Sequence, residues 1–138
     1  MAKKIRHTNY VLADTLIRLK NASAIFKDKT WVRKSKFVLA VLEVLKKHGF
    51  IRDYKELDER PYEVLVYLAY KPGNPPVPKI EHVRFYSKPG RRWYVRVSDL
   101  KPVRSGFGIQ VITTPKGVMT TDEAKKLNVG GELICEIW

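Results

Sequence analysis

The sequence predicts an α+β protein of two small subdomains, an N-terminal α-β-α-β-β unit and a mainly β C-terminal unit. Apolar residues recur every three or four positions in two stretches near the start, a spacing typical of amphipathic helices. Short apolar runs broken by Gly and Pro fill most of the remainder and predict strands. Residues 71–79, KPGNPPVPK, hold four prolines and one glycine, so we expect a linker there between subdomains 1–70 and 80–138.

The N-terminal subdomain contains two predicted helices. The first spans residues 8–22, with Thr8 or Asn9 as its N-cap. A basic stretch with β-forming residues, KTWVRK, follows it. Ser35 is the expected N-cap of the second helix, FVLAVLEVLKKHG, and Gly49 is expected to end it.

Strands account for most of the predicted structure after the second helix. FIRDYKEL and YEVLVYLAY are joined by a Glu-Arg-Pro turn, and the second run is apolar on both faces in part. Beyond the linker, strands are expected in IEHVRFYS, SKPGRRWYVRV, GIQVITT and GELICEIW. One short helix fits TDEAKKL, because Thr120 and Glu123 form a capping box at its start.

Charge indicates the class of partner. The chain has 138 residues, is 44% hydrophobic, and carries a net charge of +13, which is shared between both halves. A folded and strongly basic domain is typical of proteins that bind a polyanion, because each neutralised phosphate releases counterions. We expect no membrane partner, since no apolar stretch reaches the ~20 residues of a spanning helix. The start, MAKKIRH, lacks the apolar region of a signal peptide.

Catalytic and metal-binding patterns are not found in the sequence. His7, His48 and His82 show no metal-ligand spacing, and the single cysteine, Cys135, sits in an apolar run typical of a buried thiol. Nucleotide-binding and hydrolase motifs do not occur. We therefore expect no enzyme, no cofactor, no metal and no small-molecule substrate, and a reducing compartment such as the cytoplasm.

Two stretches carry candidate contacts with a nucleic acid. In ITTPKGVMTT, we expect a turn in which Thr113, Thr114, Lys116 and Gly117 follow a sugar-phosphate chain closely and reach a ribose 2′-hydroxyl. Gly130-Gly131 opens the last strand with similar backbone freedom. The alternative interpretation of this stretch is an ordinary polar hairpin turn.

The second stretch, SKPGRRWYV, combines a Pro-Gly turn with cations and aromatic rings. Arg91 and Arg92 have the forked donors that match phosphate. Trp93 and Tyr94 should point to opposite faces of a strand, so one would enter the core and the other could lie against a sugar or base. The alternative interpretation is a solvated, charged turn.

The chain resembles the family of the bacterial-type eighth protein of the small ribosomal subunit. The stretch ITTPKGVMTTDEAKK is similar to the family signature, and GGELICEIW, SKPGRRWYV and ADTLIRLKNA are similar to its C-terminal end, its central basic turn and its first helix. The signature matches are Gly108, Val111, Ile112, Thr113, Thr114, Gly117, Val118, Met119, Ala124 and Lys125. These motifs occur in the family's order and cover nearly the whole chain.

The resemblance implies a structural ribosomal protein that binds the central domain of the small-subunit ribosomal RNA and supports its assembly, beside neighbouring ribosomal proteins. It implies a ribosome in the cytoplasm or in an organelle with bacterial-type ribosomes, and main RNA contacts from the C-terminal subdomain. The RNA-binding residues that it implies are Thr113, Thr114, Lys116, Gly117, Lys88, Arg91, Arg92, Tyr94, Gly130, Gly131, Glu132, Thr8, Arg18 and Asn21.

Two departures from the family pattern bear on these contacts. The family turn usually reads Ser-Thr-Ser, whereas this chain has Thr113-Thr114-Pro115, and Pro115 has neither a hydroxyl nor an N–H. The family commonly has Asp-Pro before the first helix, where this chain has Asn9-Tyr10.

A winged-helix-like DNA-binding module is the alternative function, with residues 8–22 and 35–48 as its helices. A recognition helix should be basic along one face, but the stretch 35–48 is mostly apolar, with Lys46 and Lys47 only at its end.

Overall fold

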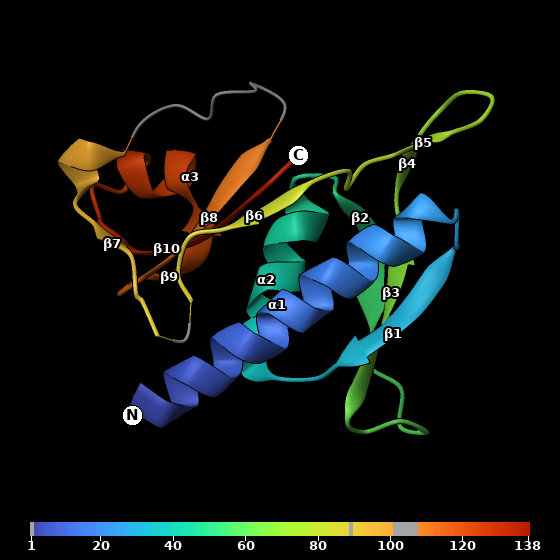
Figure 1. Ribbon diagram of the computed structural model, residues 1–138, viewed down its shortest axis with the longest axis horizontal. Helices are drawn as coiled ribbons and strands as arrows, with labels where there is room; N and C mark the ends of the chain where they lie inside the picture. Colours follow the sequence, from blue (N-terminus) through green and yellow to red (C-terminus); the bar gives the residue numbers. More distant parts are fainter. Residues whose placement is uncertain (1, 89, 101–107) are drawn as a thin grey trace.

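A computed structural model describes residues 2–88, 90–100 and 108–138, with side chains of the first helix described from residue 11 onward. The described chain contains three α-helices and three antiparallel sheets, of which one has only two short strands, and this confirms the predicted α+β class. In Figure 1 the N-terminal sheet lies to the right, the C-terminal strands lie to the left, and the two long helices cross the middle.

The first helix, α1, spans Ala2–Ala24 and is longer than the predicted 8–22. Its buried face follows the expected spacing, with Leu12, Leu16 and Leu19 almost fully enclosed. The prediction of an N-cap at Thr8 or Asn9 is wrong, because the helix continues through both. The residues before Thr8 are mostly good helix formers and include neither Gly nor Pro. The helix therefore begins upstream, although the Thr8 side chain could have capped it.

The N-terminal sheet has the order β1-β3-β2, with β1 at Lys29–Arg33, β2 at Ile51–Lys55 and β3 at Glu63–Leu68. All neighbours are antiparallel. Leu65 is buried on one face of β3, and Val64 and Val66 are buried on the other, as predicted for a run that is apolar on both faces in part.

The second helix, α2, spans Lys36–Lys47, which confirms the predicted helix and its N-cap at Ser35. The Ser35 hydroxyl accepts a hydrogen bond from the Val38 N–H at 3.1 Å. Gly49 follows the C-terminal end with φ of +80°, a conformation that favours glycine. Val38, Leu42 and Leu45 of this helix face the core.

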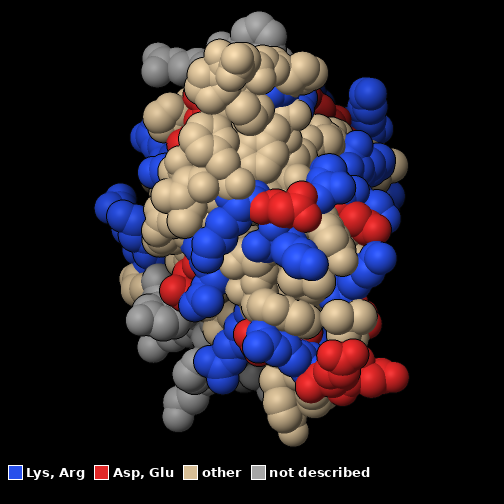
Figure 2. All heavy atoms as spheres, turned by 90° about the vertical axis from the view of Figure 1, so that its right-hand side faces the viewer, with Lys and Arg blue, Asp and Glu red and all other residues tan. Residues whose placement is uncertain are grey.

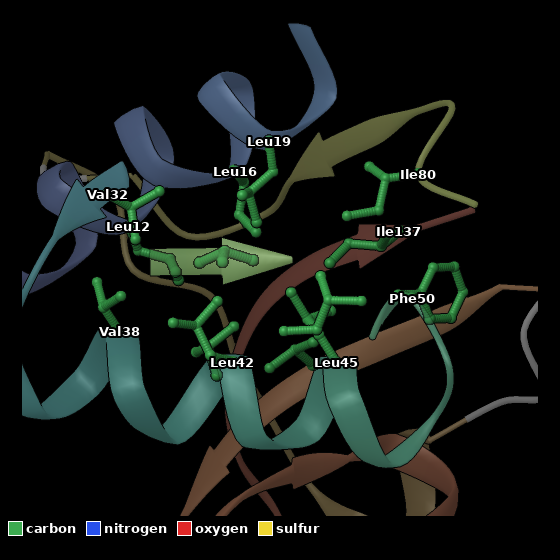
Figure 3. Packing of buried hydrophobic residues seen from close by; sticks show 14 of the residues in the cluster. Leu12, Leu16, Leu19, Val32, Val38, Leu42, Leu45, Phe50, Ile80 and Ile137 are labelled. Carbon is green, nitrogen blue, oxygen red and sulfur yellow. The ribbon is translucent and has the colours of Figure 1, made fainter. Parts of the chain in front are cut away.

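The Pro-rich segment 71–79 contains two short strands that we did not predict. β4, Tyr70–Lys71, pairs with β5, Val77–Pro78, in a two-stranded ladder. The boundary between subdomains 1–70 and 80–138 stays a prediction. Side chains from both sides of this segment pack into one cluster, in which Ile137 and Ile80 lie near Leu16, Leu19 and Leu45 (Figure 3).

The C-terminal sheet has the order β6-β10-β8-β9, and β7 pairs with the same edge of β10 as β6. The strands are β6 (Val83–Phe85), β7 (Tyr94–Val95), β8 (Ile109–Thr114), β9 (Gly117–Thr120) and β10 (Gly131–Ile137). A 3-10 turn, η1, spans Val97–Asp99. We did not predict β9, because four residues after a turn are too few for a clear alternation.

The short helix α3, Thr121–Lys126, begins with the predicted capping box. The Thr120 hydroxyl accepts from the Glu123 N–H at 3.2 Å, and the Glu123 carboxylate accepts from the Thr120 N–H at 3.0 Å. The same carboxylate accepts from Lys47 Nζ at 2.5 Å and lies 3.3 Å from His48 Nε2. Glu123 therefore joins the end of α2 to the start of α3.

The Glu123 interactions predict a stability change at acid pH. Burial raises the pKa of Glu123, but the hydrogen bonds from Lys47 and Thr120 outweigh it and lower this pKa to about 2, from 4.5. A depressed carboxyl pKa stabilises the fold above pH 4.5, and this contribution is lost as the pH falls towards 2. We expect about 1 kcal/mol, since Lys47 is exposed and its charge is screened.

Measuring the free energy of urea unfolding between pH 2 and 6 checks this prediction. Glu123→Gln keeps the capping acceptor but removes the charge, so its stability should vary less with pH than that of the wild type. Asp122→Asn, on the exposed side of the same helical turn, is the control. An identical pH profile for wild type and Glu123→Gln would contradict the assignment.

Gly131 predicts a second stability effect, because a Cβ there would collide with the Thr113 carbonyl oxygen. Gly131→Ala should lower the free energy of unfolding by about 1–3 kcal/mol through overpacking. Gly90→Ala is the matched control, since its Cβ would meet nothing within 4 Å. Urea titration of both variants checks this, and equal stabilities would refute the close approach.

Candidate nucleic-acid interface

Three of the predicted C-terminal contacts lie on one rung of the sheet. In the register of the strands, Tyr94 of β7 lies opposite Glu132 of β10, and Glu132 lies opposite Thr113 of β8. Side chains on one rung of neighbouring strands project to the same face. The structure therefore brings together residues that are nearly forty positions apart in the chain.

The tip of the β8–β9 hairpin is the turn from Thr113 to Gly117, here called the hydroxyl turn. The Thr114 hydroxyl donates to the Gly117 carbonyl at 2.9 Å and accepts from the Lys116 N–H at 3.1 Å. Gly117 has φ of +119°, so the turn requires a glycine there. Thr114 thus closes the turn, and Lys116 is left exposed to solvent.

Thr113 differs from Thr114 in how its hydroxyl is used. Thr113 is half-buried, and its side chain has no hydrogen-bond partner within the residues that the structure describes. Its hydroxyl can therefore donate to and accept from a ligand without breaking an internal bond. Of the two adjacent threonines, Thr113 has the hydroxyl that is more available to a ligand.

Gly130 and Gly131 are explained by contacts within the protein. A Cβ on Gly130 would lie 2.5 Å from the Val95 carbonyl oxygen, and one on Gly131 would overlap the Thr113 carbonyl. Both glycines let β10 approach the strands on either side of it. The two glycines therefore have a structural role, which is to allow the close strand packing that aligns Tyr94, Glu132 and Thr113.

Arg92 and Glu132 form a largely enclosed ion pair. Arg92 Nη1 lies 3.3 Å from Glu132 Oε2, and the two side chains are 17% and 7% exposed. An enclosed pair of this kind holds both side chains in place, because removing either leaves a buried charge. Glu132 therefore positions Arg92, and Glu132 is itself the strand partner of Tyr94.

Lys88, Arg91 and Tyr94 are exposed on the hairpin that leads into β7. The backbones of Lys88 and Arg91 exchange hydrogen bonds of 2.8 and 2.9 Å. The prediction that one neighbouring aromatic enters the core is wrong, because Trp93 is 45% exposed and Tyr94 is 69% exposed. β7 is an edge strand of two residues, and of its side chains Val95, not Tyr94, packs against the small cluster around Ile112.

The N-terminal candidates lie on α1 and do not join this rung. Arg18 lies 3.9 Å from Asp14 in the predicted i, i+4 pair. Arg18 and Asn21 line a shallow hollow with Lys27 and Thr30. The Thr8 side chain lies outside the described residues.

The open face of the N-terminal sheet is a basic and aromatic surface that the sequence did not reveal. The Tyr67 ring has Lys29 Nζ at 6.0 Å, and Arg52 Cζ and Lys55 Nζ at 5.5 Å each. Figure 2 views the molecule from the side of β1, where basic side chains are spread widely. The alternation in KTWVRK was the signal, but only the β1–β3 register places Lys29 beside Tyr67.

Within the described part of the chain, no three His, Cys, Asp or Glu side chains gather in a way that could hold a metal ion. None of its helices is long and apolar enough to span a membrane.

Comparison with known proteins identifies the family. The family described as Ribosomal protein S8 matches residues 10–138. Small ribosomal subunit protein uS8 of Thermus aquaticus is 46% identical over 134 residues, which cover 92% of this chain and 96% of that protein. The protein of the same name from Thermus thermophilus is 47% identical with the same coverage. That from Helicobacter pylori is 42% identical over 132 residues, which cover 94% and 98%.

The match spans both sheets and both candidate stretches, so it confirms the resemblance drawn from the sequence motifs. The chain belongs to the ribosomal protein S8 family.

Proposed function

We propose that this protein is a structural component of the small ribosomal subunit that binds the central domain of the small-subunit ribosomal RNA directly and supports its assembly. The observation that carries the proposal is the rung of Tyr94, Glu132 and Thr113, with Lys116 at the adjacent hairpin tip. It combines an exposed ring, a hydroxyl without an internal partner among the described residues, and a nearby cation across three strands of one sheet. The relatives' name, small ribosomal subunit protein uS8, supports this assembly as the setting.

The chemistry of the rung suits RNA. The major groove of an A-form helix is too narrow for side chains, so proteins recognise its wide minor groove through 2′-hydroxyl and phosphate contacts. A threonine hydroxyl donates to and accepts from a 2′-hydroxyl, and Lys116 at the adjacent hairpin tip supplies charge to nearby phosphates. The net charge of +13 adds long-range attraction to the same polyanion.

The DNA-binding alternative is not supported by the contacts of α2. Five residues of this helix are buried against the core, and its terminal cations are engaged in ion pairs. Lys46 Nζ lies 3.1 Å from Asp53, and Lys47 pairs with Glu123. A recognition helix needs an exposed basic face, and α2 lacks one.

An enzymatic role is not supported by Cys135 either. The thiol is fully enclosed, and burial raises its pKa far above the usual range. A nucleophilic cysteine requires an accessible thiolate. The proposal is therefore a binding protein of the ribosome in the cytoplasm, or in an organelle with bacterial-type ribosomes, next to other small-subunit proteins.

RNA binding is tested with a stem from the central domain of the small-subunit RNA and a DNA duplex of equal length. The RNA stem should bind more tightly at physiological salt, and the logarithm of affinity should fall with the logarithm of salt by about 0.7–0.9 per phosphate contact. Lys116→Gln should reduce this slope by about one and weaken binding without unfolding the protein.

Lys36→Gln is the charge-matched control, because Lys36 is exposed at the start of α2 and belongs to neither candidate stretch. Fluorescence anisotropy at several salt concentrations measures both quantities. Equal affinities for the RNA stem and the DNA duplex would refute the proposed function.

Thr113→Val tests the hydroxyl contact separately. It removes one hydroxyl that has no internal partner, so RNA affinity should fall about three- to tenfold with unfolding unchanged. Thr114→Val should lower both affinity and stability, because its hydroxyl closes the turn. Wild-type affinity in Thr113→Val would remove Thr113 from the interface.

A further inference from the structure

A hollow of about 470 Å³ lies between β6 and the hairpin that leads into β7. Its size falls within the roughly 300–1,000 Å³ range of small-ligand sites. The lining combines cations and aromatic rings, and the residues that form it are Arg84, Phe85, Tyr86, Lys88, Arg91 and Trp93. It lies on the opposite face of the hairpin from Arg92 and Tyr94, because neighbouring residues of an extended strand alternate.

Two aromatic rings make the wall of this hollow. Tyr86 and Trp93 meet edge to face, with centroids 5.6 Å apart and planes at 73°. The Tyr86 hydroxyl donates to Glu136 Oε1 at 2.7 Å and accepts from Gln110 Nε2 at 3.3 Å, so its ring is held from behind. Trp93 is nearly half exposed, which leaves a broad apolar surface in contact with water.

The backbone beneath the wall is fixed by hydrogen bonds to β10. The Trp93 N–H donates to the Ser87 hydroxyl at 2.9 Å, and this hydroxyl donates to the Leu133 carbonyl at 2.8 Å. The Leu133 N–H donates to the Trp93 carbonyl at 2.8 Å. The rings are therefore positioned before any ligand arrives, which lowers the entropy cost of binding.

Three cations border the hollow without a carboxylate to neutralise them. In the described parts of the chain, no carboxylate oxygen lies within 4 Å of the charged nitrogens of Arg84, Lys88 or Arg91. The Arg84 guanidinium lies 5.3 Å from the centre of the Tyr86 ring. Glu136 is mostly buried and its carboxylate accepts hydrogen bonds from Tyr86 and Gln110.

We propose that this hollow binds one unpaired nucleotide of the RNA, with its base against Trp93 and its phosphate between Lys88 and Arg91. The inference rests on the proposed function and names the feature of the RNA that this part of the protein recognises. Bases without a pairing partner stack on aromatic side chains, whereas a paired base must first be extruded at a cost. Arg84 offers a second planar group for stacking.

The location favours a nucleotide over an acidic peptide. Tyr94 belongs to the proposed RNA surface and lies on the same short hairpin as Lys88, Arg91 and Trp93, so an RNA bound to Tyr94 lies close to the hollow. An acidic peptide would use the cations but would leave the face of Trp93 uncovered. A base and its phosphate engage both.

The test uses the full chain and three RNA stems that differ at one position. The first stem carries a single unpaired adenosine, the second carries an abasic residue there, and the third is fully paired. The wild type should bind the first most tightly. Trp93→Leu should weaken binding to the first stem by about tenfold, to the level of the abasic stem, because stacking on one ring is lost.

Trp93→Phe keeps an aromatic face and should retain most of the preference for the unpaired adenosine. Tyr62→Leu, at an exposed aromatic residue outside the hollow, is the control and should bind all three stems as the wild type does. Unfolding curves of each variant establish that the fold is intact. The exposed position of Trp93 means that its replacement leaves no buried cavity.

The outcomes separate this inference from the function on which it rests. If Trp93→Leu lowered the affinity for all three stems equally, or lowered it for none, the nucleotide site would be overturned while RNA binding stayed in place. Trp93-dependent displacement of the adenosine stem by a glutamate-rich peptide would assign the hollow to a protein partner instead. Stems that bind no better than duplex DNA would overturn both proposals.

Discussion

The position of β10 is the constraint on which the rest of the structure depends. β10 pairs with β6 and β7 on one edge and with β8 on the other, and it sends Cys135 and Ile137 into the core shared with α1 and α2. The backbones meet so closely at Gly131 that no side chain fits. This contact places the hydroxyl turn at the end of β8 on one side of β10, and the hairpin that leads into β7 on the other side.

The Lys and Arg side chains fall into two groups, those paired with carboxylates and those that are not. Lys46, Lys47 and Arg92 are held in ion pairs with carboxylates, where they join elements or position a side chain. Lys88 and Arg91 have no carboxylate within ion-pair distance among the described residues, and both border a hollow with exposed aromatic rings. Net charge alone therefore indicates the class of partner, while the pairing of individual cations distinguishes those that hold the fold together from those that we expect to meet the partner.

Local signals account for the elements that we predicted correctly. Ser35 and the Thr120–Glu123 pair cap the helices that follow them, as their chemistry requires. The same reasoning was wrong at Thr8, because a residue that can cap a helix does so only if the preceding chain leaves the helical conformation. It was wrong at Trp93, since alternation along a strand shows that two side chains diverge but not whether either face is covered.

The sequence by itself determined the α+β class, the capped helices, the basic character and the family motifs, because these depend on neighbouring residues or on composition. Only the tertiary structure decided what the candidate residues do. Thr114 closes a turn, Glu132 holds Arg92, and Gly131 makes room for Thr113, and each role depends on a partner that a sheet register or a tight turn supplies. The hollow beside Trp93 has the same origin, since β10 fixes the backbone on both sides of it.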